Sequence, residues 1–399
     1  MKKSVLMSLA AVAALSAEGI EATSAAGKAG GEVRAVYVSQ DNEIAEDTYT
    51  TAIGGILKYE TAAWNDIKLG AGAYVSEKLG FASGSGDKLN YDVLSSKNGS
   101  YAYVGEAYID YSTNDFSLRI GRQLIDTPFA DTDDIRMHPN TFESVIASYG
   151  AIEKTTLVGG YITRWVGYDS GDDISEFKKL SEGSNGAVVI GFTNESVENL
   201  AVQGWYYGAD KVADIYYADA AYAVPFNETV GLEISAQYAA FDEKTNAAGT
   251  DSGSDGIVYG FGVSLNAGPM SIGAAYNRGS NDEGKTLSNG FGGGPFMTSM
   301  EEWTIDGMED VKAYQVSVAI DMAGAGIEGL SLTALYGSFK SAPSNTEVRE
   351  IDVIATYEIN ERLGIDMSYA TIDDRNNNTG DGGTDGGYSR FLARMSYNF

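Results

Sequence analysis

Apolar and polar residues alternate strictly along several stretches of the chain. In residues 230–240, the apolar side chains of Val230, Leu232 and Ile234 alternate with small or polar residues, and segments 257–266 and 313–322 repeat the pattern. A period of two residues predicts β-strands, because successive side chains of a strand point to opposite faces. The second face carries mostly small and polar residues, so we expect it to meet water or a polar lumen rather than a dry core.

About eighteen segments of the chain show this alternation, which predicts an all-β protein. The predicted strands are 32–39, 51–60, 66–76, 101–111, 115–123, 143–149, 155–165, 186–193, 200–208, 213–224, 229–241, 256–266, 269–277, 311–322, 329–339, 348–359, 362–372 and 388–399.

The connections between these segments alternate between long and short. The long connections are 40–50, 77–100, 124–142, 166–185, 242–255, 278–310 and 373–387; only 209–212 and 340–347, which also fall in long-loop positions, are of modest length. The short ones are 61–65, 112–114, 150–154, 194–199, 225–228, 267–268, 323–328 and 360–361. Outer-membrane β-barrels have short periplasmic turns at one rim and long external loops at the other, and closure of the sheet satisfies every backbone polar group in lipid. We therefore predict a single transmembrane antiparallel β-barrel of about 18 strands.

The N-terminus predicts export. Lys2 and Lys3 precede an apolar stretch at 5–15, and small residues follow, which is typical of a secretory signal peptide. The predicted organisation is a signal peptide at 1–17 with cleavage after Ser16 or Ala17, a short N-terminal periplasmic segment at 18–31 and the barrel at 32–399. The expected location is the outer membrane of the cell.

Composition narrows the range of partners and chemistry. The chain has 399 residues, 56 acids and 27 Lys plus Arg, giving a formal charge of −29; nucleic acid is excluded as a partner because binding it needs a basic face. The absence of cysteine and the single histidine, His138, rule out thiolate and multi-histidine metal sites. The 26 tyrosines fit aromatic girdles at both membrane interfaces. The sequence predicts no metal site and no cofactor.

The last predicted strand ends the chain on an aromatic residue. Phe391, Met395, Tyr397 and Phe399 share one face, and Arg390 lies on the other. A terminal aromatic on an alternating strand resembles the signal read by the barrel-assembly machinery of Gram-negative bacteria. We therefore assign Tyr397 and Phe399 to an assembly signal and expect that machinery as a partner, together with outer-membrane lipid and lipopolysaccharide.

Two loop segments resemble one known family. Residues 121–143 begin with GRQLIDTPF and end with DDIRMHPNTFE, and residues 292–307 read GGGPFMTSMEEWTIDG. Both are similar to the OprD-like (Opr) family of outer-membrane porins, in the variety common among epsilon-type Gram-negative bacteria. The resemblance implies eighteen strands, in agreement with the independent count, and a lumen narrowed by inward-folded third and seventh loops. In this chain those loops are 124–142 and 278–310.

The two loops supply candidate constriction residues of both charge signs. They are Arg122, Asp126, Asp131, Asp133, Asp134, Arg136, Phe296 and Trp303. Opposed charges across a narrow pore select ions; alternatively, Arg136 pairs with Asp133 or Asp134 to hold the loop against the wall, and both roles are compatible. Phe296 and Trp303 form an apolar plug, for which packing is favoured over ligand contact.

Charged residues also fall on the polar face of the predicted strands, and the lipid face disfavours them. The predicted pore-lining bases are Lys58, Lys68, Arg119, Arg164, Arg390 and Arg394. The predicted pore-lining acids are Glu60, Glu106, Asp110, Glu233, Asp321, Asp352 and Asp366. The resemblance implies a ladder of arginines that guides carboxylate-bearing solutes, but here acids balance the bases, so the sign of the ion preference stays open.

The predicted function is that of a porin for passive diffusion of ions and small hydrophilic solutes, with carboxylate-bearing solutes among the candidates. A structural or adhesive barrel is the alternative class, and a homotrimer is left open. A rim-located hydrolase is the least favoured alternative, although His138 lies near Asp133, Asp134 and Ser144 in sequence. Residues 251–255 and 381–387 are short acidic, glycine-rich segments that could offer oxygen ligands to calcium, but solvated loops are the favoured interpretation.

Overall fold

The computed structural model describes residues 27–171, 173–376 and 386–399. The predicted signal peptide at 1–17 lies outside these residues. Among the described residues, no helix is long and apolar enough to cross a membrane.

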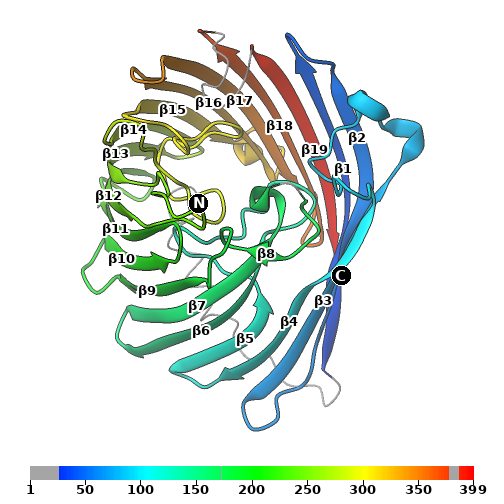
Figure 1. Cartoon of the computed structure of the whole chain (residues 1–399), viewed down its shortest axis with the longest axis vertical. Coiled ribbons are helices and arrows are strands. Elements are labelled where there is room, and N and C mark those ends of the chain that lie inside the picture. The colour runs from blue at the N-terminus through cyan, green and yellow to red at the C-terminus, as the bar shows by residue number, and fades with distance from the viewer. Residues whose placement is uncertain (1–26, 172, 377–385) are drawn as a thin grey trace.

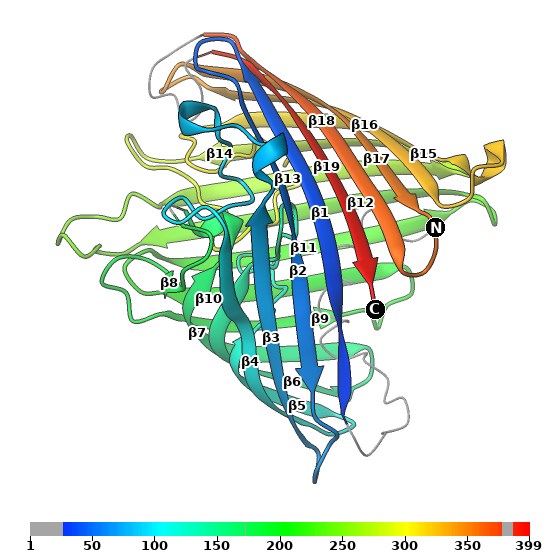
Figure 2. The same ribbon diagram turned by 90° about the vertical axis from the view of Figure 1, so that its right-hand side faces the viewer.

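Antiparallel strands form one sheet that closes on itself (Figures 1 and 2). The strands are β1 (Lys28–Asn42), β2 (Thr48–Glu60), β3 (Ile67–Lys78), β4 (Tyr101–Ser112), β5 (Phe116–Gln123), β6 (Thr141–Ile152), β7 (Thr155–Val166), β8 (Lys178–Lys179), β9 (Ala187–Asn194), β10 (Leu200–Ala209), β11 (Ala213–Pro225), β12 (Val230–Glu243), β13 (Gly256–Ala267), β14 (Met270–Ser280), β15 (Lys312–Asp321), β16 (Leu330–Ser341), β17 (Thr346–Glu358), β18 (Leu363–Asp374) and β19 (Tyr388–Asn398). Each barrel strand pairs with its neighbours in chain order, and β1 pairs with both β2 and β19.

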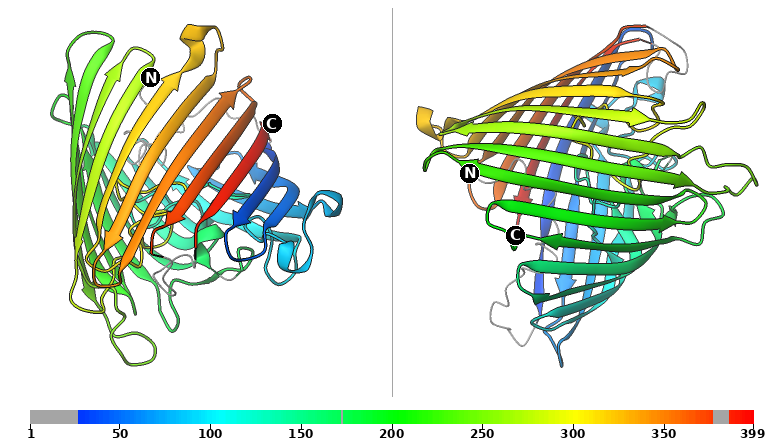
Figure 3. Two further views of the ribbon diagram at one scale, coloured as in Figure 1. Left: turned by 90° about the horizontal axis from the view of Figure 1, so that it is seen from above. Right: turned by 90° about the vertical axis from the view of Figure 1, so that its left-hand side faces the viewer.

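The barrel has the eighteen strands that the alternation predicts. The additional strand, β8, is a two-residue segment that pairs with the end of β7, and β7 pairs with β9 to continue the wall. Figure 3 shows the strands running obliquely around the barrel. The predicted all-β fold class is confirmed.

The register places apolar and polar faces as the sequence pattern indicates. On β12 and β13, Ile234 pairs with Val263, and both side chains are exposed on the outside of the barrel. Glu233 and Ser264 pair on the opposite, inward face. An exposed apolar exterior is what lipid requires of a membrane barrel, because lipid-facing and lumen-facing residues alternate along each strand.

Some strands are longer than the pattern predicts. Strand β1 begins at Lys28, which pairs with Glu60, so residues 28–31 belong to the wall. The same strand extends to Asn42 and β2 begins at Thr48, and the predicted long connection at 40–50 is therefore a short one. The backbone pairing of neighbouring strands continues into polar residues. Apolar and polar side chains no longer alternate there, so the sequence pattern does not mark the strand ends.

Four long connections at one rim position the candidate site. We name them loop 2 (79–100), loop 3 (124–140), loop 4 (167–186) and loop 7 (281–311). Figure 1 shows the yellow loop 7 and the green and cyan loops lying within the ring of strands. Their buried apolar side chains pack against inward-facing wall residues, so the hydrophobic core of this molecule lies inside the barrel.

Candidate functional site

Loops 3 and 7 meet inside the barrel through their backbones. Ala130 and Phe291 form a parallel bridge, and the N–H of Phe291 donates to the carbonyl of Phe129 at 2.9 Å. The Asp131 carboxylate accepts hydrogen bonds from the N–H groups of Gly293 and Gly294, each at 3.2 Å. The predicted third and seventh loops are therefore joined into one structure across the lumen.

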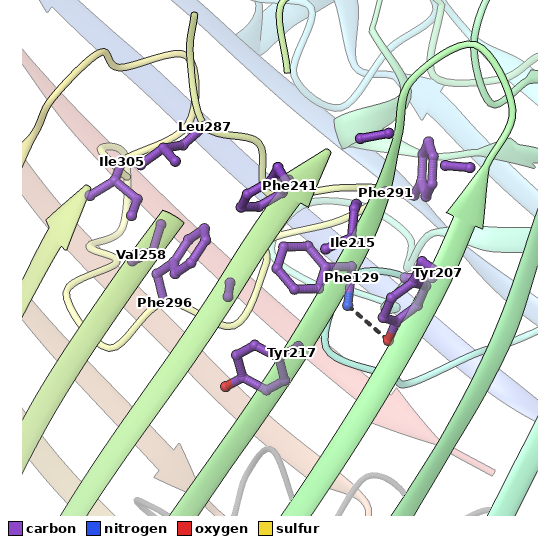
Figure 4. Packing of buried hydrophobic residues seen from close by; sticks show 14 of the residues in the cluster. Phe129, Tyr207, Ile215, Tyr217, Phe241, Val258, Leu287, Phe291, Phe296 and Ile305 are labelled. Atoms are coloured by element: carbon purple, nitrogen blue, oxygen red, sulfur yellow. Dashed lines mark hydrogen bonds between the residues drawn. The ribbon is translucent and has the colours of Figure 1, made fainter. Parts of the chain in front are cut away.

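An aromatic side chain of loop 3 attaches this structure to the wall. Phe129 is fully buried, and its ring packs edge-on against Tyr207 of β10, Tyr217 of β11 and Phe241 of β12 at centroid distances of 5.6, 5.7 and 5.6 Å (Figure 4). Phe296 of loop 7 packs against the same ring at 5.9 Å. Edge-to-face aromatic pairs add specific stabilisation to the burial of apolar area, so Phe129 is the main anchor of loop 3.

Loop 7 is attached to the wall at a second point, on β16 and β17. Trp303 is buried and packs against Phe339, with ring centroids 6.5 Å apart. Glu350 accepts from the backbone N–H groups of Glu302 and Trp303, both at 2.9 Å. Asp352, predicted to line the pore, accepts from the N–H of Glu301 at 3.1 Å and is fully buried. Asp352 therefore points inward as predicted but holds the loop.

Arg136 of loop 3 is buried among charged groups from other loops. Its guanidinium pairs with Glu302 of loop 7 at 3.0 Å and with Asp92 of loop 2 at 3.7 Å, and it lies over the Tyr168 ring of loop 4 at 4.4 Å. Arg390 of β19 shares Glu302 and Asp92 with it. Arg136 thus has a loop-holding role, but its ion-pair partners are Glu302 and Asp92 in place of Asp133 or Asp134.

A pair of carboxyl groups joins loop 3 to loop 4. Asp133 has a left-handed backbone with a φ of 33°, and its carboxyl hydrogen-bonds to that of Asp169, which also accepts from the Asn140 amide at 2.6 Å. Burial, with the charges of Asp169 and Asp131, raises the pKa of Asp133 to about 9. The pair therefore holds a proton at neutral pH, which allows two carboxyl groups to be neighbours.

A cavity of about 960 Å³ lies between the joined loops and strands β11–β16. Loop 3 contributes Asp126, Asp131, Asp133 and Asp134, and loop 7 contributes the segment 294–297. Asp219 and Glu233 bring the acidic lining residues to six, and no Lys or Arg is found among the described residues that line this space. The loops thus border an acidic cavity whose lining also includes apolar side chains.

The family of the chain follows from this geometry and from comparison with known proteins. A family model described as outer membrane porin, OprD family, matches residues 26–382. The chain belongs to this family. Its members reside in the outer membrane and act as channels, so the porin identity and the location predicted from the sequence are confirmed.

Solved structures of porins share the fold at low sequence identity. OccK9 (OpdG) of Pseudomonas aeruginosa has a TM-score of 0.77 and 19% identity, covering 94% of this chain and 98% of that one. OccAB2 of Acinetobacter baumannii has a TM-score of 0.77 and 16% identity, covering 93% and 98%. OpdK of Pseudomonas aeruginosa, solved with vanillate, has a TM-score of 0.73 and 18% identity, covering 94% and 98%. Comparison with curated protein sequences gives no match.

Basic side chains toward the short-turn end of this porin occur as close ion pairs. Lys58 lies 2.6 Å from Glu106, and Lys68 lies 3.0 Å from Glu60. In the same region Arg119 pairs with Asp110 at 2.9 Å and lies over the Tyr108 ring at 4.3 Å. These six predicted lining residues point inward, but each base is matched by an acid at close range.

Arg34 and Arg394 lie side by side on the inward face of β1 and β19. Arg34, which sequence analysis missed, binds Asp134 of loop 3 at 2.6 Å and Glu32 at 2.9 Å. Arg394 lies 3.8 Å from Asp134 and 3.9 Å from Asp366. The alternation in β1 could have identified Arg34, because it shares the inward parity of the strand; Asp92 and Glu302 lie in loops, where no periodicity marks them.

Three predicted pore residues occupy other positions. The prediction for Arg164 is wrong, because a bulge in the β6–β7 pairing sets this residue opposite Glu143 on the exposed outer face. Arg122, at the end of β5, donates to the Val104 carbonyl at 3.0 Å and lies over the Phe177 ring, and it does not line the cavity. Asp321 accepts from the N–H of Ala323 at 2.8 Å at the short-turn rim.

The single histidine belongs to loop 3 and packs against the wall strands β3 and β4. The ring of His138 lies between Tyr74 and Tyr101, and its Nε2 is 3.0 Å from the Val75 carbonyl. Burial lowers the pKa of His138 to about 4, so the ring is neutral and Nε2–H donates to that carbonyl. These contacts support the structural role that its position in the loop suggests.

Of the two acidic segments considered for calcium, the structure describes the first in full and the second only in part. In residues 251–255, Asp251 lies 3.5 Å from Lys285. Within the described part of the chain, no group of three or more His, Asp and Glu is arranged to hold a metal ion. Of the second segment, residues 381–385 lie outside the described residues.

The C-terminal residue closes the sheet through its backbone. The Phe399 N–H donates to the Gly31 carbonyl at 3.0 Å, and the Gly31 N–H donates back at 3.1 Å. The side chains of Tyr397 and Phe399 are exposed on the outer face. Their assignment to an assembly signal stays a prediction.

Proposed function

We propose that this porin conducts ions and small hydrophilic solutes by passive diffusion through the lumen narrowed by loops 124–142 and 278–310. The observation that carries the proposal is the backbone junction of Ala130 and Phe291, which holds both loops inside the barrel beside a cavity of about 960 Å³. Charged and polar side chains line that cavity, and such linings select among solutes by size and charge.

The test is conductance of the purified, refolded protein in a planar lipid bilayer with KCl on both sides. Discrete current steps are expected. A bilayer that stays silent, with a protein whose heat-modifiable mobility in electrophoresis shows a folded barrel, would contradict the proposal and favour the structural or adhesive alternative, or a rim-located hydrolase.

Carboxylate-bearing solutes are the second candidate. Three wall arginines, Arg34, Arg390 and Arg394, lie close to loop 3, which itself carries Arg136. The similar porin OpdK was solved with vanillate, a carboxylate. All four are ion-paired, which is why we place carboxylates second. Faster swelling of porin-containing liposomes in vanillate than in a neutral sugar of similar size would move them to first place.

We also propose the remaining partners that the sequence predicts. Lipopolysaccharide faces the acidic external loops, the barrel-assembly machinery inserts the chain, and the homotrimer stays an open possibility. Cross-linking in intact outer membranes separates a monomer from a trimer.

A further inference from the structure

One acid of loop 3 covers two arginines of the wall. Both carboxylate oxygens of Asp134 accept from Arg34, Oδ1 at 2.6 Å and Oδ2 at 2.8 Å. Arg394 also donates to the Asp134 backbone carbonyl, and its guanidinium lies 3.8 Å from the side chain. A bidentate pair of this kind fixes both geometry and charge, so loop 3 and the inward face of β1 and β19 meet at Asp134.

The exposed fractions show which member of this cluster a solute meets. The Asp134 side chain is 39% exposed and lines the acidic cavity, whereas the Arg34 side chain is 6% exposed. Glu32 lies behind Arg34, and Arg394 also faces Asp366. The Asp134 carboxylate therefore faces the lumen and covers the Arg34 guanidinium.

The charge count around the cluster is negative at neutral pH. Burial opposes ionisation of Asp134, but its hydrogen bond to Arg34 and the charges of Arg34 and Arg394 outweigh burial and lower the pKa of this carboxyl. With Glu32 and Asp366, three carboxylates surround the guanidinium groups of Arg34 and Arg394. The neighbouring Arg136 and Arg390 are balanced by Asp92 and Glu302, so the wider cluster keeps one more acid than bases. A pore lined by one sign of charge concentrates ions of the opposite sign, and here that sign favours cations.

We propose that Asp134 is the residue that determines ion specificity in this porin: it covers the arginines of β1 and β19, so the channel prefers cations, and its neutralisation opens the arginine surface to anions and carboxylates. The inference rests on the proposed porin function, because it concerns which solutes an open channel passes. On this proposal the inward arginines of the chain do not by themselves give a carboxylate preference.

The decisive variant is Asp134→Asn, which keeps size and removes charge. Reversal potentials in a KCl gradient are expected to show cation preference in the unaltered protein and a fall in the K⁺/Cl⁻ permeability ratio of about threefold or more, to below one, in the variant. Vanillate entry in liposome swelling is expected to rise in the variant relative to a neutral sugar of similar size.

The matched control is Asp126→Asn. Asp126 lines the same cavity on the same loop, but its carboxylate accepts from the hydroxyl of Thr132 at 2.5 Å and, within the described part of the chain, from no arginine. Its neutralisation is expected to reduce cation preference without increasing vanillate entry. Equal effects of the two variants on both readouts would overturn the proposal, because Asp134 would then act only as one lumen charge among several.

A double variant guards against misfolding of the single one. Arg34→Gln with Asp134→Asn removes both members of the bidentate pair, so Arg34 is not left as an unpaired buried charge; Arg394 keeps Asp366 as a partner. Because Arg394 remains, the double variant is expected to show a smaller gain in vanillate entry than Asp134→Asn; a gain as large as that of the single variant would count against the proposal. Anion preference in the unaltered, conducting protein would also overturn it, whereas absence of current would overturn the porin proposal itself.

Discussion

At the scale of single residues, Asp131 shows that burial and backbone N–H donors shift the pKa of a carboxyl group in opposite directions. Burial raises its pKa to about 7, from an ordinary value of 3.8, although the N–H groups of Gly293 and Gly294 act in the other direction. A carboxyl with a raised pKa is favoured in its protonated form in the folded state. Its contribution to the free energy of unfolding is therefore fully present below about pH 4 and is lost as the pH rises through about 7.

The variant Asp131→Asn is expected to remove this pH dependence. Between pH 5 and pH 8 the unfolding temperature of the unaltered protein should fall further than that of the variant, by an amount worth up to a few kcal/mol, because one pKa unit corresponds to about 1.4 kcal/mol. Thermal unfolding followed by heat-modifiable mobility across this pH range measures it. The control is Glu153→Gln in an exposed turn; superimposable pH profiles for all three proteins would show that Asp131 does not titrate as described.

At the scale of elements, one aromatic ring of loop 3 joins the loop to three wall strands and to loop 7. Phe129 contacts three wall strands and loop 7, and its N–H donates to the Tyr207 hydroxyl at 3.2 Å. Truncation of a buried phenylalanine to alanine costs about 3–5 kcal/mol. Phe129→Ala is therefore expected to weaken the packing of loop 3 against the wall by a free energy of that magnitude. It should also raise single-channel conductance, because the loop no longer narrows the lumen.

The measurement is single-channel conductance beside thermal stability. Phe226→Ala is the control, because Phe226 is an exposed phenylalanine in a turn at the other rim. It should change neither quantity appreciably. Unchanged conductance in Phe129→Ala, with a lowered unfolding temperature, would mean that the loop narrows the lumen without help from this ring.

The elements also show where sequence patterns lose their information. The inward folding of loops 3 and 7 could be expected from their resemblance to a porin family, but loops 2 and 4 join the same structure through Asp92 and Asp169, which no periodicity marks. At β7, one extra residue in the pairing with β6 reverses the parity of Arg164. A bulge of this kind shifts every later side chain of a strand, so a strict two-residue rule fails beyond it.

At the scale of the whole molecule, strand number and order could be predicted because each strand pairs with its neighbour in the chain and each has one lipid face. Strict alternation is the direct record of that geometry. The charge pattern of the lumen could not be predicted in the same way, since it depends on contacts between residues about 100 positions apart, such as Arg34 with Asp134. Parity indicates which residues face inward, but it does not tell which of them are covered by a partner.

Phe399 lies where β1 and β19 close the barrel. Its backbone groups serve the folded sheet, and its side chain is the predicted assembly signal, so the two roles can be tested separately. The hydrogen bonds between Phe399 and Gly31 join backbone groups, and the Phe399 side chain, whose ring lies close to Gly31, is 52% exposed. Phe399→Ser keeps both backbone hydrogen bonds, so the protein refolded in detergent should retain its heat-modifiable mobility and its conductance. If the side chain is the assembly signal, the amount of folded porin in the outer membrane of expressing cells should fall several-fold.

The control is Trp64→Ser, which removes an exposed aromatic side chain from the turn at the same rim. It should leave the amount of folded porin in the outer membrane close to that of the unaltered protein. A parallel loss in both variants would indicate a general need for aromatic residues at the membrane interface, where they are enriched in barrels. Failure of Phe399→Ser to refold in detergent would assign the residue to closure of the barrel. Recognition by the assembly machinery is supported only if the amount of folded porin in cells falls while refolding in detergent stays intact. Of these steps, only recognition depends on a side chain that the finished barrel leaves exposed.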